Sequence, residues 1–181
     1  MKGPAGARIR EADMTDLEAI TAIYGHHVRH SVASFEEEPP DRGTMEGRYR
    51  ASLGHGLPYL VAEPVPRDVL GYAYAAPYHA RPGYRFTVEN SVYVAPEVQG
   101  RGLGRALMTE LLARCTALGY RQMIAIIGVG ETPASIRLHE SLGFQHAGRL
   151  AAVGFKFGRW IDCVVMQRPL GDGAGSLPEG V

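Results

Sequence analysis

Three glycines spaced by single residues, Gly100, Gly102 and Gly104, stand between a β-branched segment and a segment of helical period. Glycine has no Cβ, so the backbone N–H groups of such a loop can approach a phosphate closely. The helix that follows adds positive potential at its N-terminus through its aligned peptide dipoles. A carboxylate, Glu89, lies upstream on the same predicted strand. This layout predicts an enzyme that uses a phosphate-bearing cofactor.

Two other phosphate-binding loops are excluded by the residues present. The nucleotide P-loop requires Gly-Lys-Ser or Gly-Lys-Thr, and neither occurs in the chain. The dinucleotide fingerprint needs a third glycine where Arg105 stands, together with an acidic residue at the end of the next parallel strand. A plain strand–turn–helix connection, with the glycines serving packing alone, is the alternative to a cofactor loop.

The run Gln99-Gly100-Arg101-Gly102-Leu103-Gly104 fits the pattern Q/R-x-x-G-x-G/A, and here the chain resembles the GNAT acetyltransferase superfamily. The resemblance implies that acetyl-CoA binds with its pyrophosphate on this loop and its pantetheine arm along the preceding strand. Related chains carry an asparagine near Thr132, so the resemblance also implies a weakened cofactor contact there. The cofactor-binding residues implied are Val92, Tyr93, Val94, Gln99, Gly100, Arg101, Gly102, Leu103, Gly104, Arg105, Thr132 and Ser135.

The likeness extends beyond the loop, over about Arg8–Gln167, to the phosphinothricin and methionine sulfoximine N-acetyltransferase branch. Several short segments in the same order are more specific than any one of them. The matching segments are Ser34-Phe35, Gly71-Tyr72-Ala73-Tyr74, Ala80-Arg81-Pro82-Gly83-Tyr84, Thr87-Val88-Glu89-Asn90-Ser91-Val92-Tyr93-Val94, Ser135-Ile136-Arg137-Leu138-His139-Glu140, Leu142-Gly143-Phe144 and Gly154-Phe155-Lys156-Phe157-Gly158-Arg159-Trp160-Ile161-Asp162.

Acyl transfer from a thioester to an amine needs an unprotonated nucleophile, a stabilised oxyanion and a proton for the leaving thiolate. The resemblance gives Glu89 the role of general base, against the alternative of an ordinary solvent-facing glutamate. The backbone N–H groups of Val92 to Val94 are the expected oxyanion donors. For the acid, the branch has a histidine where His139 stands, and Tyr93 is the alternative. His139 could instead be a packed helix histidine.

Substrate recognition calls for a fixed cation and aromatic walls around a small zwitterion. Arg81 can bind an oxyanion in bidentate fashion, and it lies in a loop between strands, where such sites belong. For the aromatic residues, core packing is an equal alternative. The predicted substrate-binding residues are Phe35, Tyr74, Arg81, Tyr84, Thr87 and Glu89.

The composition of the 181 residues allows one domain, expected over residues 7–168. Nineteen basic and nineteen acidic residues balance, so no nucleic-acid partner is expected. Met1–Arg10 shows no signal-peptide pattern, and no apolar run reaches the length of a membrane span.

Cys115 and Cys163 are expected to be buried thiols in a reducing cytosol. We see no metal-ligand spacing; the histidines near position 27 are expected to be solvated or packed. The resemblance implies a homodimer.

Periodicity predicts the order βααβββαβαββ, an α/β (α+β) GNAT fold with a mixed, twisted sheet of about seven strands flanked by four helices. Thr15 and Glu18 predict a capping box for the first helix. The glycine-rich tail 171–181 predicts disorder. The predicted strands are Ala7–Glu11, Tyr59–Glu63, Val69–Ala76, Tyr84–Ala95, Gln122–Ile127, Phe144–Phe155 and Trp160–Gln167, and the predicted helices are Thr15 to about Arg29, Asp41–Leu53, Gly102–Leu118 and Pro133–Leu142.

Three functions remain open at this point. The first is an acetyl-CoA-dependent N-acetyltransferase for a small amino-acid-like compound of the phosphinothricin, methionine sulfoximine or methionine sulfone type. The second keeps the fold and acetylates a protein N-terminus, polyamine or aminoglycoside, for which the acidic run Glu36–Glu38 is the only hint. The third is an acetyl-CoA-binding module without catalysis; an intact Glu89 and His139 argue against it.

Overall fold

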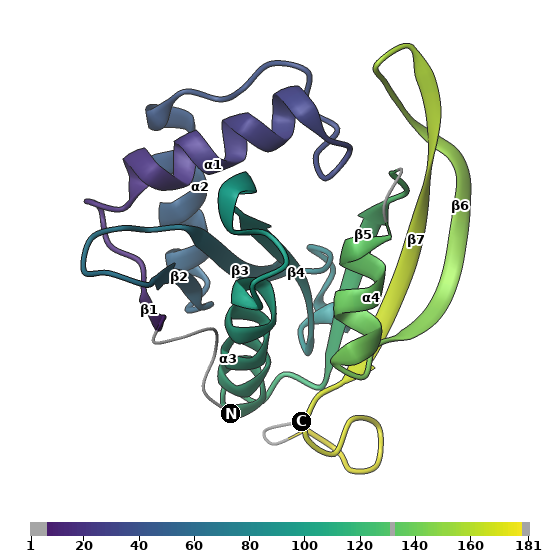
Figure 1. The fold of residues 1–181 in the computed structure, drawn as a ribbon. Coiled ribbons are helices and arrows are strands. Elements are labelled where there is room, and N and C mark those ends of the chain that lie inside the picture. The colour runs from purple at the N-terminus through teal and green to yellow at the C-terminus, as the bar shows by residue number, and fades with distance from the viewer. Residues whose placement is uncertain (1–6, 131–132, 179–181) are drawn as a thin grey trace.

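The computed structural model describes residues 7–130 and 133–178, and over these ranges it forms one seven-stranded mixed sheet with four helices (Figure 1). The strand order is β1-β2-β3-β4-β5-β7-β6. This confirms the predicted fold class. The strands are β1 (Arg8–Glu11), β2 (Tyr59–Glu63), β3 (Gly71–Pro77), β4 (Thr87–Val94), β5 (Gln122–Gly128), β6 (Gln145–Lys156) and β7 (Arg159–Pro169), and the helices are α1 (Leu17–His30), α2 (Arg42–Gly54), α3 (Leu103–Ala117) and α4 (Ala134–Ser141).

The two central strands, β4 and β5, run parallel and then separate. Their register pairs are Thr87↔Gln122, Val88↔Met123 and Glu89↔Ile124, and no pair follows although both strands continue and are fully described. On its other side β4 remains paired with β3 as far as Val94. The second half of β4 therefore presents an unpaired edge toward β5.

The two faces of the sheet are covered by different helices. Four tyrosines, Tyr59, Tyr72, Tyr74 and Tyr93, stack along one face. Tyr24 of α1 meets the ring of Tyr93 edge-on. On the other face, Gly71 of β3 lies against Leu107 of α3. The helices α1 and α2 thus cover one face, and α3 and α4 the other (Figure 1).

The first helix begins differently from the prediction. Its N-cap is Asp16, and Thr15 donates its hydroxyl to Asp13 instead of capping the helix. The Asp16 carboxylate accepts two hydrogen bonds from the Arg10 guanidinium, at 2.6 and 2.8 Å. The predicted capping box is therefore wrong, because the Thr15 hydroxyl bonds to Asp13 and the helix begins one residue later, after Asp16.

The start of β4 also differs from the prediction. Tyr84 does not begin β4 but belongs to a short 3₁₀ turn, Pro82–Tyr84, in which its N–H donates to Arg81 O. Proline fixes φ near the helical value and favours such a turn. Within the tail, residues 171–174 form turns, and Arg121 donates to Ser176 Oγ and Leu177 O; the disorder of the tail stays a prediction. Residues 179–181 lie outside the described residues.

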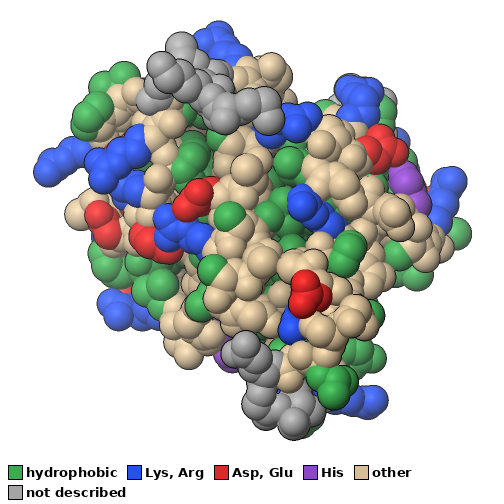
Figure 2. Space-filling view, turned by 90° about the horizontal axis from the view of Figure 1, so that it is seen from below, with side chains coloured by type: hydrophobic (Ala, Val, Ile, Leu, Met, Phe, Trp, Pro, Cys, Tyr) green, Lys and Arg blue, Asp and Glu red, His purple; other side chains and the backbone are tan. Residues whose placement is uncertain are grey.

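The hairpin β6–β7 extends past the ends of the other strands (Figure 1). Ladder irregularities lie between His146 and Gly148 and between Leu150 and Gly154. Such irregularities bend a strand and increase its twist. On the face seen from below, basic and acidic side chains are interspersed (Figure 2). Within residues 7–130 and 133–178, no helix is long and apolar enough to cross a membrane.

Candidate active site

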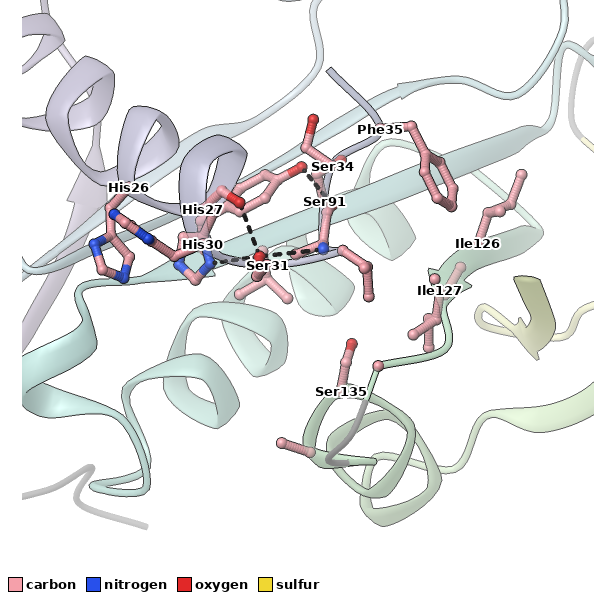
Figure 3. A pocket seen from close by; sticks show the side chains of 18 of the residues that line it. His26, His27, His30, Ser31, Ser34, Phe35, Ser91, Ile126, Ile127 and Ser135 are labelled. Carbon is pink, nitrogen blue, oxygen red and sulfur yellow. Dashed lines mark hydrogen bonds between the residues drawn. The ribbon is translucent and has the colours of Figure 1, made fainter. Parts of the chain in front are cut away.

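A cavity of about 1000 Å³ opens where β4 and β5 separate. His26, His27 and His30 of α1 line one side, and Phe35 and Ile126 line the opposite side (Figure 3). The start of α4 and the tip of the β6–β7 hairpin complete the lining. A cavity at a divergence of strands combines backbone groups that lack a ladder partner with side chains from several elements, the setting in which ligand sites are found.

Glu89 lies at the last register pair before the strands separate, between Ala76 of β3 and Ile124 of β5. Its side chain is half-buried and lines the cavity. Burial raises the pKa of this carboxyl group above its ordinary value, and the nearby His79 opposes that shift. A carboxylate with a raised pKa is a stronger base at neutral pH than an exposed one.

The free edge of β4 offers backbone donors at alternate residues. Ala95 N–H bonds to Leu70 O, so the odd-numbered residues of β4 face β3 and the even-numbered ones face the cavity side. The N–H groups of Val92 and Val94 therefore point to the free edge. The N–H of Tyr93, which we also expected at this edge, points to β3 by the same alternation.

His27 closes the end of that edge. Its Nε2 lies 2.9 Å from Val94 O, so Nε2 carries the proton and donates to this carbonyl. The ring is buried, and burial lowers its pKa, although the bond to the carbonyl opposes the shift. The histidine expected to be solvated or packed thus satisfies a backbone acceptor that has no strand partner.

His139 of α4 is buried, and each of its ring nitrogens lies near an oxygen acceptor, only one of which the single N–H of a neutral ring can bond. Nε2 lies 3.0 Å from Asn90 Oδ1, and Nδ1 lies 2.8 Å from Ser135 O. The Asn90 amide donates through Nδ2 to Ile124 O at 3.0 Å, which fixes its oxygen toward the imidazole. Burial lowers the pKa of His139, and the Ser135 carbonyl opposes this.

The glycine loop connects the cavity to the N-terminus of α3. Gly100 and Gly102 have positive φ values of 74° and 84°, a conformation that residues with a side chain rarely adopt. A Cβ at Gly104 would lie 3.3 Å from Leu138 Cδ2, a tight contact, so a glycine here lets α3 and α4 pack closely. The loop backbone, the helix N-terminus and the free edge of β4 together fit a long thioester cofactor that ends in a pyrophosphate.

Comparison with known proteins agrees with this geometry. Residues 20–144 match the profile of the acetyltransferase (GNAT) family. The chain belongs to the GNAT acetyltransferase family.

Two relatives and one solved structure show how far the likeness of this acetyltransferase extends. A phosphinothricin N-acetyltransferase from Alcaligenes faecalis is 57% identical over 166 residues, covering 91% of this chain and 83% of that protein. An L-methionine sulfoximine/L-methionine sulfone acetyltransferase from Pseudomonas paraeruginosa is 42% identical over 161 residues, covering 89% of this chain and 93% of that one. The crystal structure of a GNAT superfamily phosphinothricin acetyltransferase from Sinorhizobium meliloti in complex with AcCoA has a TM-score of 0.93 at 50% identity, covering 97% and 95% of the two chains.

These likenesses confirm the predicted enzyme class, an acyltransferase that uses acetyl-CoA as its co-substrate. The part of the chain that the structure describes holds no group of three or more His, Cys, Asp or Glu side chains placed to bind a metal ion.

The structure of the acetyltransferase brings some of the predicted site residues together and leaves others apart. Tyr93 is packed among Tyr24, His27 and Tyr72, and its hydroxyl donates to Ala33 O at 3.4 Å. Burial raises its pKa well above 10, so the phenol stays protonated. The predicted residues that line the cavity are Phe35, Glu89, Val92, Tyr93, Gln99, Ser135 and His139.

Four of the predicted substrate residues lie outside that lining. Arg81 is exposed, Tyr84 packs on Tyr78 and His79, Tyr74 stacks on Tyr59, and Thr87 pairs with Gln122. Arg101 and Arg105 are exposed on the glycine loop and at the start of α3. Thr132 falls outside the described residues.

Sequence reasoning missed three residues of the site: Asn90, His27 and Arg159. Asn90 and His27 act through partners that are 49 and 67 positions away in the chain, which no local pattern signals. Arg159 lines the cavity from the start of β7 beside Phe157. It lies in the segment Gly154–Asp162, which carries part of the family resemblance, and this resemblance was the sequence signal that could have indicated its role.

Proposed function

We propose that this acetyltransferase transfers the acetyl group of acetyl-CoA to the amino group of a small amino-acid-like substrate of the phosphinothricin, methionine sulfoximine or methionine sulfone type. The observation that carries the proposal is the position of Glu89, half-buried in the cavity at the point where β4 and β5 separate. The names of the two relatives support the substrate class.

In the proposed reaction, Glu89 removes a proton from the substrate ammonium group. The nitrogen lone pair then forms a C–N bond with the thioester carbonyl carbon, while the N–H groups of Val92 and Val94 stabilise the oxyanion. The C–S bond breaks, the new amide nitrogen releases its second proton to solvent, and His139 gives a proton to the thiolate. Glu89 then returns its proton to solvent, and His139 takes one back. We assign the protonation of the thiolate to His139, which lines the cavity, because burial raises the pKa of the Tyr93 phenol well above its ordinary value and makes it a poor proton donor.

The cation that receives the acidic end of the substrate is Arg159 in this proposal. It lines the same cavity as Glu89, whereas Arg81 does not. Guanidinium groups bind tetrahedral and planar oxyanions through two parallel hydrogen bonds. Phe35 and Phe157 supply the apolar walls beside it.

We also propose that the enzyme is a cytoplasmic homodimer. Phe155, Phe157 and Trp160 at the tip of the hairpin are 52%, 55% and 67% exposed, a concentration of apolar surface typical of an interface. Both cysteines, Cys115 and Cys163, are buried free thiols, as in a reducing compartment. Light scattering of the purified chain and of Trp160→Ala tests the dimer; a monomeric wild-type chain would contradict it.

The experiment that tests the function is a thiol-release assay with acetyl-CoA. L-phosphinothricin, methionine sulfoximine and methionine sulfone form one group of amines, and spermidine and a peptide N-terminus form the other. Saturable turnover of the first group supports the proposal. Turnover confined to the second group, or acetyl-CoA binding without any turnover, would reject the substrate class.

A further inference from the structure

The edge strand β6 is exposed along most of its length and has two buried residues. Of its residues, all of which the structure describes, Gly154 and Lys156 are the two that are buried. Both lie at the tip of the hairpin, and both contact the segment Ser31–Phe35, which follows α1 and lines the cavity. A strand that is exposed elsewhere thus has two buried contacts, and both converge on one short loop.

Gly154 makes room for the ring of Phe35. A Cβ built on Gly154 would lie 2.4 Å from Phe35 Cε1, 2.6 Å from Cζ and 2.8 Å from Cδ1. Real Cβ contacts essentially never fall below 3.0 Å, so any side chain at Gly154 would displace the ring. A second glycine, Gly128 at the end of β5, lies on the same ring, with its own built Cβ 3.3 Å from Cζ.

Lys156 holds the backbone that carries this phenylalanine. Its side chain is 3% exposed, and its ammonium group donates to Ser31 O at 3.0 Å and to Ser34 O at 2.6 Å. Burial lowers the pKa of Lys156, which Glu36 and Glu37 oppose. A buried ammonium that donates to two carbonyls fixes both peptide groups, since either carbonyl left without a donor would be costly.

The opposite side of the loop is fixed as well. Tyr24 shares a hydrogen bond of 2.8 Å with Ser34 Oγ and donates to Glu36 at 2.9 Å. Glu36 in turn pairs with Arg48 of α2 at 2.8 Å. The loop is thus held from α1, α2 and β6, while the Phe35 ring, 39% exposed, lies in the cavity beside Ile126 (Figure 3).

We propose that Gly154 and Lys156 are positioning residues that set Phe35 as the wall of the amine-substrate end of the cavity. The inference rests on the proposed function and deepens it. It states that residues of β6, and not of the strand that carries Glu89, determine which substrate side chains the cavity accepts. Phe35 projects from the loop on the α1 face, the face to which Glu89 also points by strand alternation with Tyr93.

The first test uses a matched pair of glycines on the same strand. Gly154→Ala adds a methyl group against Phe35, whereas a Cβ at Gly148 would meet no described atom within 4 Å. With L-phosphinothricin, Gly154→Ala should raise the KM for the amine about tenfold and leave kcat and the KM for acetyl-CoA within about twofold. Gly148→Ala should change none of these values. An equal effect of both substitutions would overturn the proposal.

A double-mutant cycle separates positioning from general damage to the fold. In a Phe35→Ala background, Gly154→Ala should change the KM for the amine by less than about twofold, because the ring it displaces is gone. If Gly154→Ala has the same effect with and without Phe35, it does not act through that residue, and the inference is wrong.

A readout without substrate keeps this inference apart from the proposed function. Hydrogen exchange of the peptide covering residues 31–36 should be faster in Lys156→Met and Gly154→Ala than in the wild type, and unchanged in Gly148→Ala. An exchange rate that none of the variants alters would overturn the positioning role. A wild-type chain inactive on all the amines, with the exchange pattern as expected, would reject the substrate class alone.

Discussion

His139 Nε2 lies 3.0 Å from Asn90 Oδ1, and the same amide donates through Nδ2 to Ile124 O at 3.0 Å. Ile124 belongs to the last register pair of β4 with β5. One side chain therefore spans the two strands where they separate and also orients the imidazole of α4. The orientation of the Asn90 amide follows from the Ile124 carbonyl, because a reversed amide would place Asn90 Oδ1 against Ile124 O.

Asn90→Ala should lower kcat about tenfold with a smaller change in the KM for either substrate, because His139 loses the acceptor that orients its Nε2–H. Thiol release measures the kinetics. The ¹⁵N shifts of the imidazole report whether the ring has changed its tautomer, which damage to packing alone would not do. An Asn90→Ala enzyme with wild-type kcat and unaltered imidazole shifts would remove Asn90 from the mechanism.

Substitutions of the two candidate general acids, His139 and Tyr93, should affect kcat differently. His139→Gln should reduce kcat by about 10² or more, the usual contribution of a positioned general acid, while Tyr93→Phe should retain activity within a few-fold. The Tyr93 hydroxyl donates a hydrogen bond to Ala33 O, and the ring lies on the α1 face of the sheet. A large loss of kcat in Tyr93→Phe, with His139→Gln active, would reverse the assignment.

Gly100→Ala should weaken cofactor binding selectively. Gly100 has φ of 74°, and holding an L-residue there costs roughly 1 to 2 kcal/mol, so the KM for acetyl-CoA should rise about tenfold. The KM for the amine should not change. Gly83→Ala is the control, since Gly83 also has open space for a Cβ but does not have a positive φ. Equal effects of the two substitutions would argue against a loop conformation that only glycine adopts.

The order of elements was predictable from the sequence because it depends on local periodicity. Neighbouring residues encode both the strand that leads into the glycine loop and the helix that follows it. Gly100 is a residue type that adopts positive φ without strain, and its φ is indeed positive. The predicted start of β4 at Tyr84 failed because Pro82 initiates a 3₁₀ turn that the apolar pattern does not reveal.

The contacts that organise the site were not predictable in the same way. Lys156 bonds to Ser34 O across 122 positions, and the chain alone does not say which backbone carbonyl will lack a donor. The substrate cation illustrates the same limit. Arg81 and Arg159 both lie in segments that carry the family resemblance, and only the fold shows that Arg159 lines the cavity.

The buried histidines predict how stability depends on pH. Burial lowers the pKa of His27 and of His139 in the folded protein, so below about 6.5, the ordinary histidine pKa, the unfolded chain binds more protons than the native one. Stability should therefore be full above that pH and fall as the pH decreases. Thermal unfolding measured from pH 7.5 down to pH 5.5 checks the direction.

His27→Gln isolates one of the two contributions. Glutamine can still donate to Val94 O but does not titrate, so the melting temperature should fall less on acidification than in the wild type. An identical loss of stability in His27→Gln would show that this ring does not contribute.

The central claim is that Glu89 is the general base, and Glu89→Gln tests it most directly. Thiol release with L-phosphinothricin should lose about 10² to 10⁴ in kcat/KM, while acetyl-CoA binding measured by calorimetry stays within about twofold. The wild-type rate should fall as the pH drops through a pKa above the ordinary glutamate value of 4.5, because burial raises it. Wild-type turnover by Glu89→Gln, with the same acidic limb in its pH profile, would contradict the account.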